Sequence, residues 1–369
     1  MILLKILEPL GNDFVVYYEA AKMFLSGWNP YLGLVTRSFP FNYPPISLLF
    51  LFPLGFFDYA VANILWNILS LGSVLLSIWL IREIAGSPKK YFILLAIFFT
   101  FFFFPVKFNL GNAQINHFLL LFCSLSLYFY HRDRKNFSAL FLSLAIGIKL
   151  APVIFLLYFV IRRDWRQIAR VLIWLLILIA ISLIFVPVSY QIVYLRDVLP
   201  LSFTSGAKDW YYNQSLWGFL ARLLSNSPFI PFVFYPLSGF SVFFTWRRGR
   251  QVSWQRALAA VSCLYLLIHP IALQHYFSFA IIPLILLWNK KDWLILVVCY
   301  LLLAFDIKNF SQVSKELNIF LSHDFFAVLI LWSLALWREK IKIIVTFYWS
   351  IVILFIYFLG LLCRAKFCF

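Results

Sequence analysis

The chain has 369 residues, of which 64% are hydrophobic, 21% are aromatic and only 12% are charged. Soluble globular domains are about half apolar and about a quarter charged, so this composition excludes a soluble domain and predicts an all-α polytopic membrane protein. The formal net charge of +17 could indicate a nucleic-acid-binding protein. The basic residues, however, stand in short clusters between apolar runs, which is a pattern of membrane topology and argues against nucleic acid.

The N-terminal part of the chain, residues 8–58, is predicted to be a first outer loop with interfacial helices. Within it, Asp13 precedes a helical pattern in which Phe14 and Tyr17 share one face. Asp13 either caps this helix by accepting backbone N–H bonds or serves as a general base held at the membrane surface. Such a loop should follow a membrane span, but only residues 1–7 precede it, so we expect the first transmembrane helix to be missing from this sequence.

The remaining apolar runs predict one integral-membrane domain, 1–369, with about twelve membrane helices, because a span needs about 20 apolar residues. We divide it into a helical module over 59–189, a long outer loop over 190–228 and C-terminal helices over 229–362. The clear apolar runs are 59–81, 91–106, 118–130, 171–189, 229–246, 257–270, 275–288, 293–305, 325–337 and 343–362. The five cysteines show no metal-binding or redox spacing and are predicted to be inert packing thiols.

The segment 137–161 is apolar, but it contains Lys149 and Pro152 and has basic clusters at both ends. If cytoplasmic loops hold the basic clusters, both ends lie inside the cell, and the chain must turn back near Lys149 as two short helices. Proline favours this turn, because it removes a backbone donor and disfavours helix in the residue before it. The alternative is that 44–57 and 137–161 are single spans, with 82–117 inverted.

Two polar features fall on the predicted outer side of this module. Lys149 is a cation within an apolar run, and it either binds an anionic lipid phosphate at the apex of the hairpin or acts as a snorkelling or helix-capping residue. The patch 111–116 contains Gln114 and Asn116, whose amides suit sugar hydroxyls, although turn formation explains them equally well.

The long outer loop 190–228 contains Asn213, Gln214 and Ser215, followed by Arg222. On a helix, Ser215 and Arg222 would share a face, because they are seven residues apart. The guanidinium group offers a fork of donors that suits a phosphate. The alternative is an interfacial amphipathic helix with a snorkelling arginine.

His269 and His275 lie between two predicted spans, also on the outer side. A histidine at such a position is usually a hydrogen-bonded structural residue, but His275 could donate to a phosphate or a sugar hydroxyl. The sequence contains no Walker, GxGxxG, HExxH or GxSxG pattern. A transferase with this sequence would therefore need a lipid-linked donor and not a soluble nucleotide sugar.

The polar motifs occur in a specific order along the chain. They are Asp13-Phe14…Tyr17…Ala20-Ala21…Gly27-x-Asn29-Pro30-Tyr31, Tyr43-Pro44-Pro45, Gly111…Gln114-x-Asn116, Lys149-Leu150-x-Pro152, Asn213-Gln214-Ser215-Leu216…Arg222 and Pro270…His275-Tyr276. In this order the chain resembles glycosyltransferase family 87 of the GT-C superfamily, along nearly its whole length. The resemblance implies a GT-C fold and transfer of mannose, or a related sugar, from a polyprenyl-phosphate donor to a lipid or glycan acceptor.

By the resemblance, Asp13 matches the acid of the first outer loop and His275 the histidine of a later one. We predict that Asp13 is the general base of an inverting transfer and His275 a second catalytic residue, while Lys149 and Arg222 bind the donor phosphate. The residues predicted to bind substrate are Tyr17, Asn29, Tyr43, Gln114, Asn116, Asn213, Gln214 and Ser215. No cofactor and no protein-bound metal is expected, with a divalent metal left open, and the active site is expected to face outward from the bacterial plasma membrane.

Two other functions stay open from the residues alone. A lipid-linked-sugar flippase or other transporter should carry buried charges through its spans, often with inverted repeats. An O-antigen ligase or polymerase would also have a large outer loop with arginine and histidine, but it would not require Asp13. The substitution Asp13→Asn therefore separates the expected chemistry from that of a ligase or polymerase.

Overall fold

The computed structural model describes residues 12–32, 40–204, 208, 212–225, 227–306, 319 and 321–337. These residues form helices and connecting loops without any strand, and an isolated bridge pairs Asn213 with Leu273. The all-α prediction is therefore confirmed for the described part of the chain. The apolar run 343–362 and two of the cysteines lie outside it.

The helices follow one another closely. The first group comprises α2 (Asn12–Leu25), α3 (Ile46–Leu51), the 3-10 helix η1 (Phe52–Phe56), α4 (Tyr59–Ala85), α5 (Tyr91–Phe101), α6 (Phe104–Gly111), α7 (Asn116–His131), α8 (Lys135–Ile148), the 3-10 helix η2 (Ala151–Phe155), α9 (Leu156–Arg162) and α10 (Trp165–Phe185). The second comprises α11 (Val188–Val193), the π-helical η3 (Tyr194–Val198), α12 (Leu199–Thr204), α13 (Leu216–Leu223), α14 (Ile230–Gly249), α15 (Trp254–Ile268), the 3-10 helix η5 (Gln274–Ala280), α16 (Ile281–Leu286), α17 (Trp293–Ala304) and α18 (His323–Leu336).

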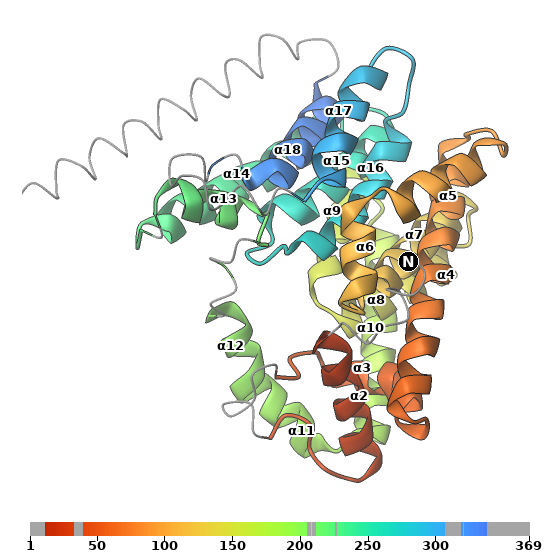
Figure 1. The fold of residues 1–369 in the computed structure, drawn as a ribbon, viewed down its shortest axis with the longest axis vertical. Coiled ribbons are helices and arrows are strands. Elements are labelled where there is room, and N and C mark those ends of the chain that lie inside the picture. Colours follow the sequence, from red (N-terminus) through yellow and green to blue (C-terminus); the bar gives the residue numbers. More distant parts are fainter. Residues whose placement is uncertain are drawn as a thin grey trace, which may run out of the picture.

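Parts of the two predicted outer loops pack against each other at one end of the molecule, where α2, α3 and α11 lie (Figure 1). The Tyr190 hydroxyl donates to the Gly27 carbonyl oxygen at 3.0 Å, and the rings of Tyr31 and Tyr194 are 5.8 Å apart. Tyr190, Tyr194 and Val198 recur at every fourth residue and are all buried, so one helical face covers the first outer loop.

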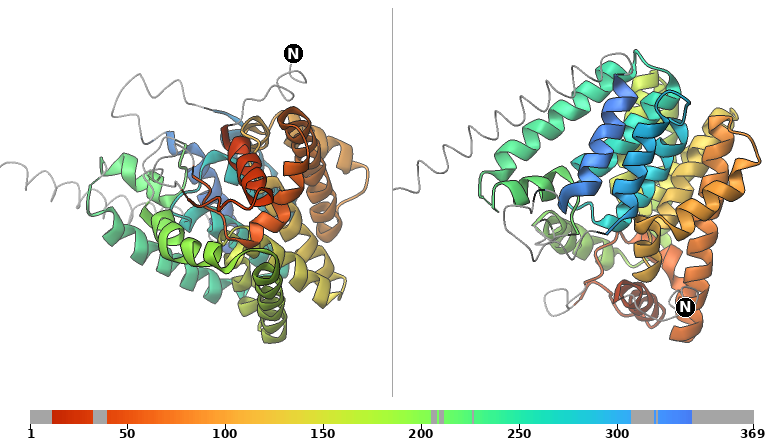
Figure 2. Two further views of the ribbon diagram at one scale, coloured as in Figure 1. Left: turned by 90° about the horizontal axis from the view of Figure 1, so that it is seen from below. Right: turned by 45° about the horizontal axis from the view of Figure 1, so that its top comes forward.

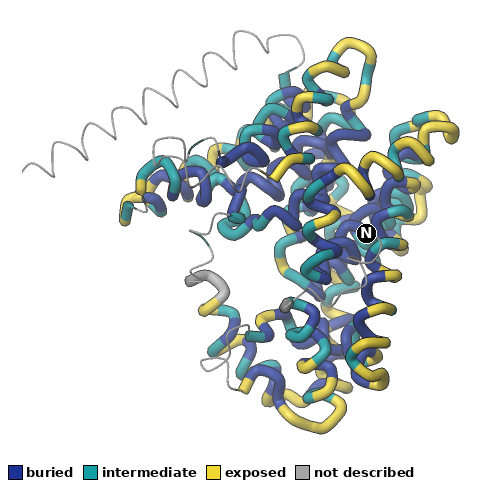
Figure 3. The backbone as a smooth tube through the Cα atoms, in the orientation of Figure 1, coloured by how far each residue is buried: buried dark blue, intermediate teal, exposed yellow. Residues whose placement is uncertain are grey.

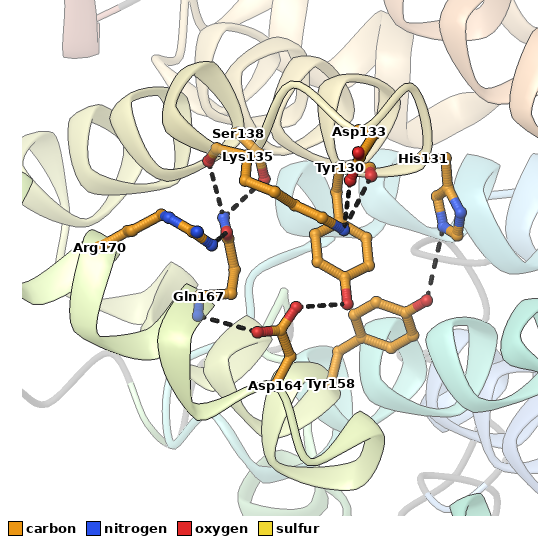
Figure 4. A network of polar contacts seen from close by, with 9 residues as sticks. All are labelled: Tyr130, His131, Asp133, Lys135, Ser138, Tyr158, Asp164, Gln167 and Arg170. Atoms are coloured by element: carbon orange, nitrogen blue, oxygen red, sulfur yellow. Dashed lines mark hydrogen bonds and ion pairs between the residues drawn. The ribbon is translucent and has the colours of Figure 1, made fainter.

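The segment between α7 and α10 is a hairpin, as predicted. The Tyr130 hydroxyl at the end of α7 donates to Asp164, which follows α9, and the Gln167 amide of α10 donates to the Lys135 carbonyl at the start of α8 (Figure 4). Both ends of the 135–162 segment therefore lie together, and the chain turns back at Lys149. The alternative of a single span over 137–161 is excluded, because a span would separate its two ends.

Several basic loops meet at this same end of the molecule. Arg132 lies 3.8 Å from the carboxylate of Glu83, the ring centroids of His131 and Trp254 are 3.9 Å apart, and Arg256 donates to backbone carbonyls near the end of α18. We call this region, which joins the ends of α4, α7, α9 and α18 to the starts of α8 and α15, the basic end. The basic loops that these contacts join therefore share one side of the protein, whereas the basic run 338–342 lies outside the described residues.

The number of membrane helices predicted, about twelve, is not confirmed. Within the described residues, α4 and α10 are long and apolar enough to cross a membrane, and α5 with α6 would make a third span. That pair bends by 58° at Phe102–Phe103. Pro105, the second residue of α6, cannot supply the backbone donor that a continuous helix needs. Several other apolar helices are shorter.

Burial separates the protein interior from the faces suited to lipid (Figure 3). Helix α15 lies among the C-terminal helices (Figure 2), and Ala257, Ala259 and Ala260 are fully buried, because small residues let neighbouring helices approach closely. On α10, by contrast, Leu176 and Ile184 are 66% and 76% exposed. Such apolar surface is stable against lipid tails, so the chain is a membrane protein.

Candidate active site

Helix α2 places Asp13 in its first turn, facing the loop between α6 and α7. The helix is held by its aromatic face, since the ring of Tyr17 lies 5.3 Å from that of Trp66 on α4. One turn after Tyr17, Gly55 approaches Ala21 so closely that a Cβ at Gly55 would lie 3.2 Å from the Ala21 backbone. Asp13 is the second residue of α2, so it lies beyond the capping position and close to the positive end of the helix dipole.

The Asp13 carboxyl group lies between an amide and a cation. Gln114 and Lys149 are both close enough to influence this carboxyl group. Burial raises the pKa of Asp13, while the polar side chain of Gln114 and the charge of Lys149 oppose that rise. A carboxylate with a raised pKa suits general base catalysis.

A chain of hydroxyl groups supports this amide. The Tyr17 hydroxyl donates to Gln114 Oε1 at 3.2 Å, and the hydroxyl oxygens of Tyr17 and Tyr43 are 2.9 Å apart. All three side chains are at most 8% exposed. The structure therefore brings the predicted residues Tyr17, Tyr43 and Gln114 together with Asp13.

Lys149 lies in the turn between α8 and η2, outside the segments long enough to span a membrane. Its Nζ is 3.4 Å from Asn116 Oδ1, 4.2 Å from the ring centroid of Tyr276 and 5.6 Å from that of Tyr43. Burial lowers the pKa of Lys149 to about 7, and the charge of Asp13 opposes this. No direct ion pair joins Lys149 to Asp13, so the ammonium group can accept an anion.

His275, the second residue of η5, faces the same place. Its ring stacks on Phe108 of α6 with centroids 5.9 Å apart, and its neighbour Tyr276 supplies the ring over which Lys149 lies. Lys149 is close enough for its charge to act on His275. Within the described residues, Nδ1 of His275 is buried without a hydrogen-bond partner.

Asn213 joins the long outer loop to the loop that carries His275. Its Nδ2 donates to Pro270 O at 2.9 Å, and its Oδ1 accepts from Ala272 N at 3.0 Å. Helix α13 approaches so closely that a Cβ at Gly218 would lie 2.0 Å from Asn213 O, which only glycine permits.

The neighbours of Asn213 make similar contacts. Gln214 donates to Leu321 O at 2.8 Å, and Ser215 Oγ accepts from Gly218 N at 3.3 Å and caps α13. Arg222 donates to Ser322 Oγ at 2.7 Å and to the carbonyl oxygen of Asn213 at 3.0 Å. These contacts hold the outer loops together, and the substrate and phosphate roles predicted for Gln214, Ser215, Arg222 and Asn213 stay predictions.

Asn29 lies in the turn after α2. Its Oδ1 accepts from the backbone N–H of Tyr31 at 3.0 Å, and the Tyr31 hydroxyl donates to Tyr43 O at 2.7 Å. Asn29 therefore shapes the backbone that presents Tyr43, and its role in substrate binding also stays a prediction.

Two site residues were not predicted to act. Tyr276 covers Lys149, and the only signal for it in the sequence is its place beside His275. Trp66 packs on Tyr17 and donates to the carbonyl oxygen of Ala113 at 2.7 Å, and nothing in the sequence of α4 distinguishes it from other apolar residues. Among the described residues no three His, Cys, Asp or Glu side chains gather as a metal site, and the cofactor prediction stays untested.

Comparisons with known proteins agree on one family. A family model described as glycosyltransferase family 87 matches residues 41–270, which include Gln114, Asn116, Lys149 and Arg222. No solved structure matches the chain.

Two curated relatives come from Mycobacterium tuberculosis. A polyprenol-phosphate-mannose-dependent alpha-(1-2)-phosphatidylinositol pentamannoside mannosyltransferase (strain CDC 1551 / Oshkosh) is 24% identical over 67% of this chain and 58% of its own length. A polyprenol-phosphate-mannose-dependent alpha-(1-2)-phosphatidylinositol mannoside mannosyltransferase (strain ATCC 25618 / H37Rv) is 26% identical over 43% of this chain and 41% of its own length. The alignments thus span about half the length of these relatives.

Proposed function

This chain belongs to glycosyltransferase family 87, and from that premise we propose that it transfers a mannosyl group from a polyprenyl-phosphate donor to a glycolipid acceptor. The observation that carries the proposal is the placement of Asp13 and Lys149. They come from separate elements and face one region without forming an ion pair. One short loop supplies Gln114 beside Asp13 and Asn116 as the hydrogen-bond partner of Lys149. A base and a cation held apart in this way suit a displacement reaction. The base can take a proton from the attacking group, and the cation can stabilise the anion that leaves.

The proposed chemistry is a direct displacement. Asp13 takes the proton of an acceptor hydroxyl, whose oxygen attacks the anomeric carbon of the donor sugar with inversion. The bond between that carbon and the phosphate oxygen breaks through an oxocarbenium-like transition state, and the electron pair leaves with the polyprenyl phosphate. Positioned base catalysis contributes about 10²- to 10⁴-fold.

Lys149 would stabilise the leaving phosphate. Fixed cations contribute most where charge develops in the transition state, and the oxygen that leaves the sugar carbon gains negative charge there. We assign His275 to the same region as a hydrogen-bond donor, and Arg222 to the phosphate as predicted from the sequence. The donor's prenyl tail would lie in the bilayer, beside the exposed apolar helices.

We further propose a GT-C fold and an outward-facing site in the bacterial plasma membrane. Cytoplasmic loops carry an excess of lysine and arginine. The basic end lies at the ends of the α8–α9 hairpin, and Lys149 lies at its apex. The basic end would thus face the cytoplasm, and the candidate active site would face the extracytoplasmic side.

The experiment is transfer of label from radiolabelled polyprenyl-phosphate-mannose to a membrane lipid extract, with the purified protein in lipid nanodiscs. We expect a labelled lipid with the natural chain and a loss of about 10²- to 10⁴-fold with Asp13→Asn. The matched control is Asp58→Asn, because Asp58 is an exposed acid before α4. Near-normal transfer by Asp13→Asn would disprove the base assignment, and absence of any labelled lipid with the natural chain would contradict the proposed reaction.

The orientation is tested separately in intact cells with a membrane-impermeant maleimide. We expect Asp58→Cys to react, whereas Asp133→Cys, at the 93% exposed acid of the basic end, should react only after permeabilisation. The natural chain provides the background from its own thiols. The reverse pattern would place the site in the cytoplasm.

A further inference from the structure

We propose that His269 is a further ligand of the donor phosphate, which it binds through its Nε2–H beside Lys149. The inference rests on the proposed function, because it concerns the donor of that reaction. It goes beyond that function by giving a role to a histidine that the mechanism above does not use.

Helix α15 carries His269 to the candidate active site. The helix begins with Trp254, whose ring centroid lies 3.9 Å from that of His131 at the basic end. At 1.5 Å per residue its 15 residues extend about 22 Å, so its last turn lies at the other end of the hairpin. There the ring of Tyr265 lies 6.0 Å from that of Phe155, the last residue of η2, and η2 follows Lys149 directly.

The backbone around His269 is fixed by its neighbours in the chain. Pro270 disfavours helix in the residue before it, and His269 is extended, with φ of −67° and ψ of 124°, so α15 ends at Ile268. The Pro270 carbonyl oxygen accepts from Asn213 Nδ2 at 2.9 Å, and the Ile271 N–H donates to His269 Nδ1 at 3.1 Å. The imidazole is therefore held by the turn that it begins.

The hydrogen bond from Ile271 also decides which nitrogen of the ring carries the proton. A ring nitrogen that accepts cannot be protonated, so the imidazole is neutral and its N–H is at Nε2. Among the described residues no group accepts from this N–H. His269 is also partly exposed, whereas His275 is only 4% exposed. A donor that is oriented, accessible and not used by the protein suits an oxygen atom of a ligand.

The ring of Tyr276 joins this donor to the cation. The ring centroids of His269 and Tyr276 are 5.1 Å apart, and Lys149 Nζ lies 4.2 Å from the same Tyr276 centroid. Lys149 is also close enough for its charge to act on His269. An ammonium group and an N–H donor beside one ring suit an anionic oxygen, because hydrogen bonds to charged acceptors are the strong ones. The polyprenyl-phosphate donor supplies such an oxygen, and a sugar hydroxyl does not.

The test measures the Kd of farnesyl phosphate, a short prenyl phosphate without a sugar, by calorimetry with the protein in lipid nanodiscs. In His269→Asn, Oδ1 can still accept from Ile271 N, but no donor reaches the position of Nε2, and the Kd should rise by about 10-fold or more. In His269→Gln the amide nitrogen reaches that position, so most of the affinity should return. Farnesol, which lacks the phosphate, should show the same affinity for the natural chain and for both variants.

The matched control is His131→Asn, which removes a partly exposed histidine at the basic end and should leave the Kd of farnesyl phosphate unchanged. Thermal melting checks that each variant folds. If His269→Asn does not fold, His269→Ser replaces it, because a serine hydroxyl can also accept from the backbone N–H two residues on.

Natural affinity in His269→Asn with weaker binding in His269→Gln would show that the ring only holds the turn. Equal losses in the two variants would also assign a structural role. An unchanged Kd for farnesyl phosphate with a raised KM for polyprenyl-phosphate-mannose would show that His269 binds the sugar. Each of these results overturns the inference while the natural chain still transfers mannose, whereas failure of the natural chain to transfer would overturn the proposed function instead.

Discussion

The two ends of the α8–α9 hairpin use the same residue types in opposite ways. At the basic end, Lys135 Nζ lies 3.3 Å from the ring centroid of Tyr130, and at the apex Lys149 Nζ lies 4.2 Å from that of Tyr276. Each lysine lies over a tyrosine ring, and each has a carboxylate nearby. The two regions differ in which groups contact that carboxylate.

At the basic end, both oxygens of the acid Asp164 accept hydrogen bonds from the protein (Figure 4). Asp164 accepts from the Tyr130 hydroxyl at 3.0 Å with one oxygen and from Gln167 N at 3.0 Å with the other, which caps α10. Lys135 in turn donates to Tyr130 O and lies 3.9 Å from Asp133. The oxygens of this acid are thus occupied by hydrogen bonds, and the lysine by a carbonyl oxygen, a ring and an exposed carboxylate, so this end stabilises the junction of three helices.

At the apex the acid and the cation are kept apart. Asp13 faces Gln114, Lys149 faces Asn116 and aromatic rings, and no ion pair joins the two charges. Charged groups that are buried without a direct partner cost stability, and they are commonly found where they act on a substrate. The comparison teaches that the partners of a charged group within the protein, and not the residue types, distinguish a structural cluster from a reactive one.

The largest expected contrast compares the two lysines. Lys149→Met should lower mannosyl transfer by about 10²- to 10³-fold, because the leaving phosphate would lose its nearest cation. Lys135→Met should leave transfer per folded protein within about 2-fold, because Lys135 only supports the hairpin junction. Both are measured by transfer of radiolabelled mannose, and equal losses in the two variants would abolish the distinction between the ends.

The pH dependence of kcat/KM sharpens the same contrast, because this quantity reports the free enzyme. The pKa of Asp13 is raised by burial, so transfer should fall as pH drops through a value above that of an ordinary aspartate, about 3.9. The pKa of Lys149 is lowered to about 7, so transfer should also fall as pH rises through about 7. Lys149→Arg should abolish the alkaline limb because arginine does not titrate there, and a limb that persists would exclude Lys149 as its cause.

The stability of the fold should respond to Asp13 in the opposite sense to activity. Because its pKa is raised in the folded state, the folded protein binds this proton more tightly than the unfolded chain does. Stability should therefore rise as pH falls through that pKa, and Asp13→Asn should not lower the melting temperature at neutral pH. A clear loss of melting temperature in this variant would show that the carboxylate is structural.

The smallest effect is expected at the basic end, from Asp164→Ala. Loss of the α10 cap should cost about 0.5–2 kcal/mol of stability, while turnover per folded protein stays unchanged. Thermal melting in detergent, with transfer measured on the folded fraction, checks both parts. A large fall in turnover would mean that the basic end also contributes to the chemistry.

The sequence predicted local features well. The helical face of α2 and the break at Lys149 and Pro152 follow from spacing, proline geometry and basic flanks, which act between neighbours in the chain. The number of spans was harder, because several apolar helices are shorter than a bilayer and the bend between α5 and α6 divides one apolar run.

The distant contacts of the candidate residues could not be predicted in the same way. The patch 111–116 suggested either sugar binding or turn formation, and only the fold shows Gln114 beside Asp13 and Asn116 beside Lys149. Likewise, nothing near Arg222 in the sequence indicates that its guanidinium group donates to Asn213 O and Ser322. These partners are set by the packing of several helices that are distant in the sequence. No short window of sequence contains that information.

By itself, the amino-acid sequence determined that this chain is an α-helical membrane protein with basic clusters between its apolar runs, and it favoured a hairpin at Lys149. Those properties depend on the transfer of apolar side chains into lipid and on local backbone sterics, which each segment carries alone. Only the tertiary structure decided that Asp13 and Lys149 face one place without pairing, while Asp164 and Lys135 are occupied by partners within the protein at the opposite end. The reason is that a charge acts through whatever lies within a few ångströms of it, and those neighbours come from remote parts of the chain.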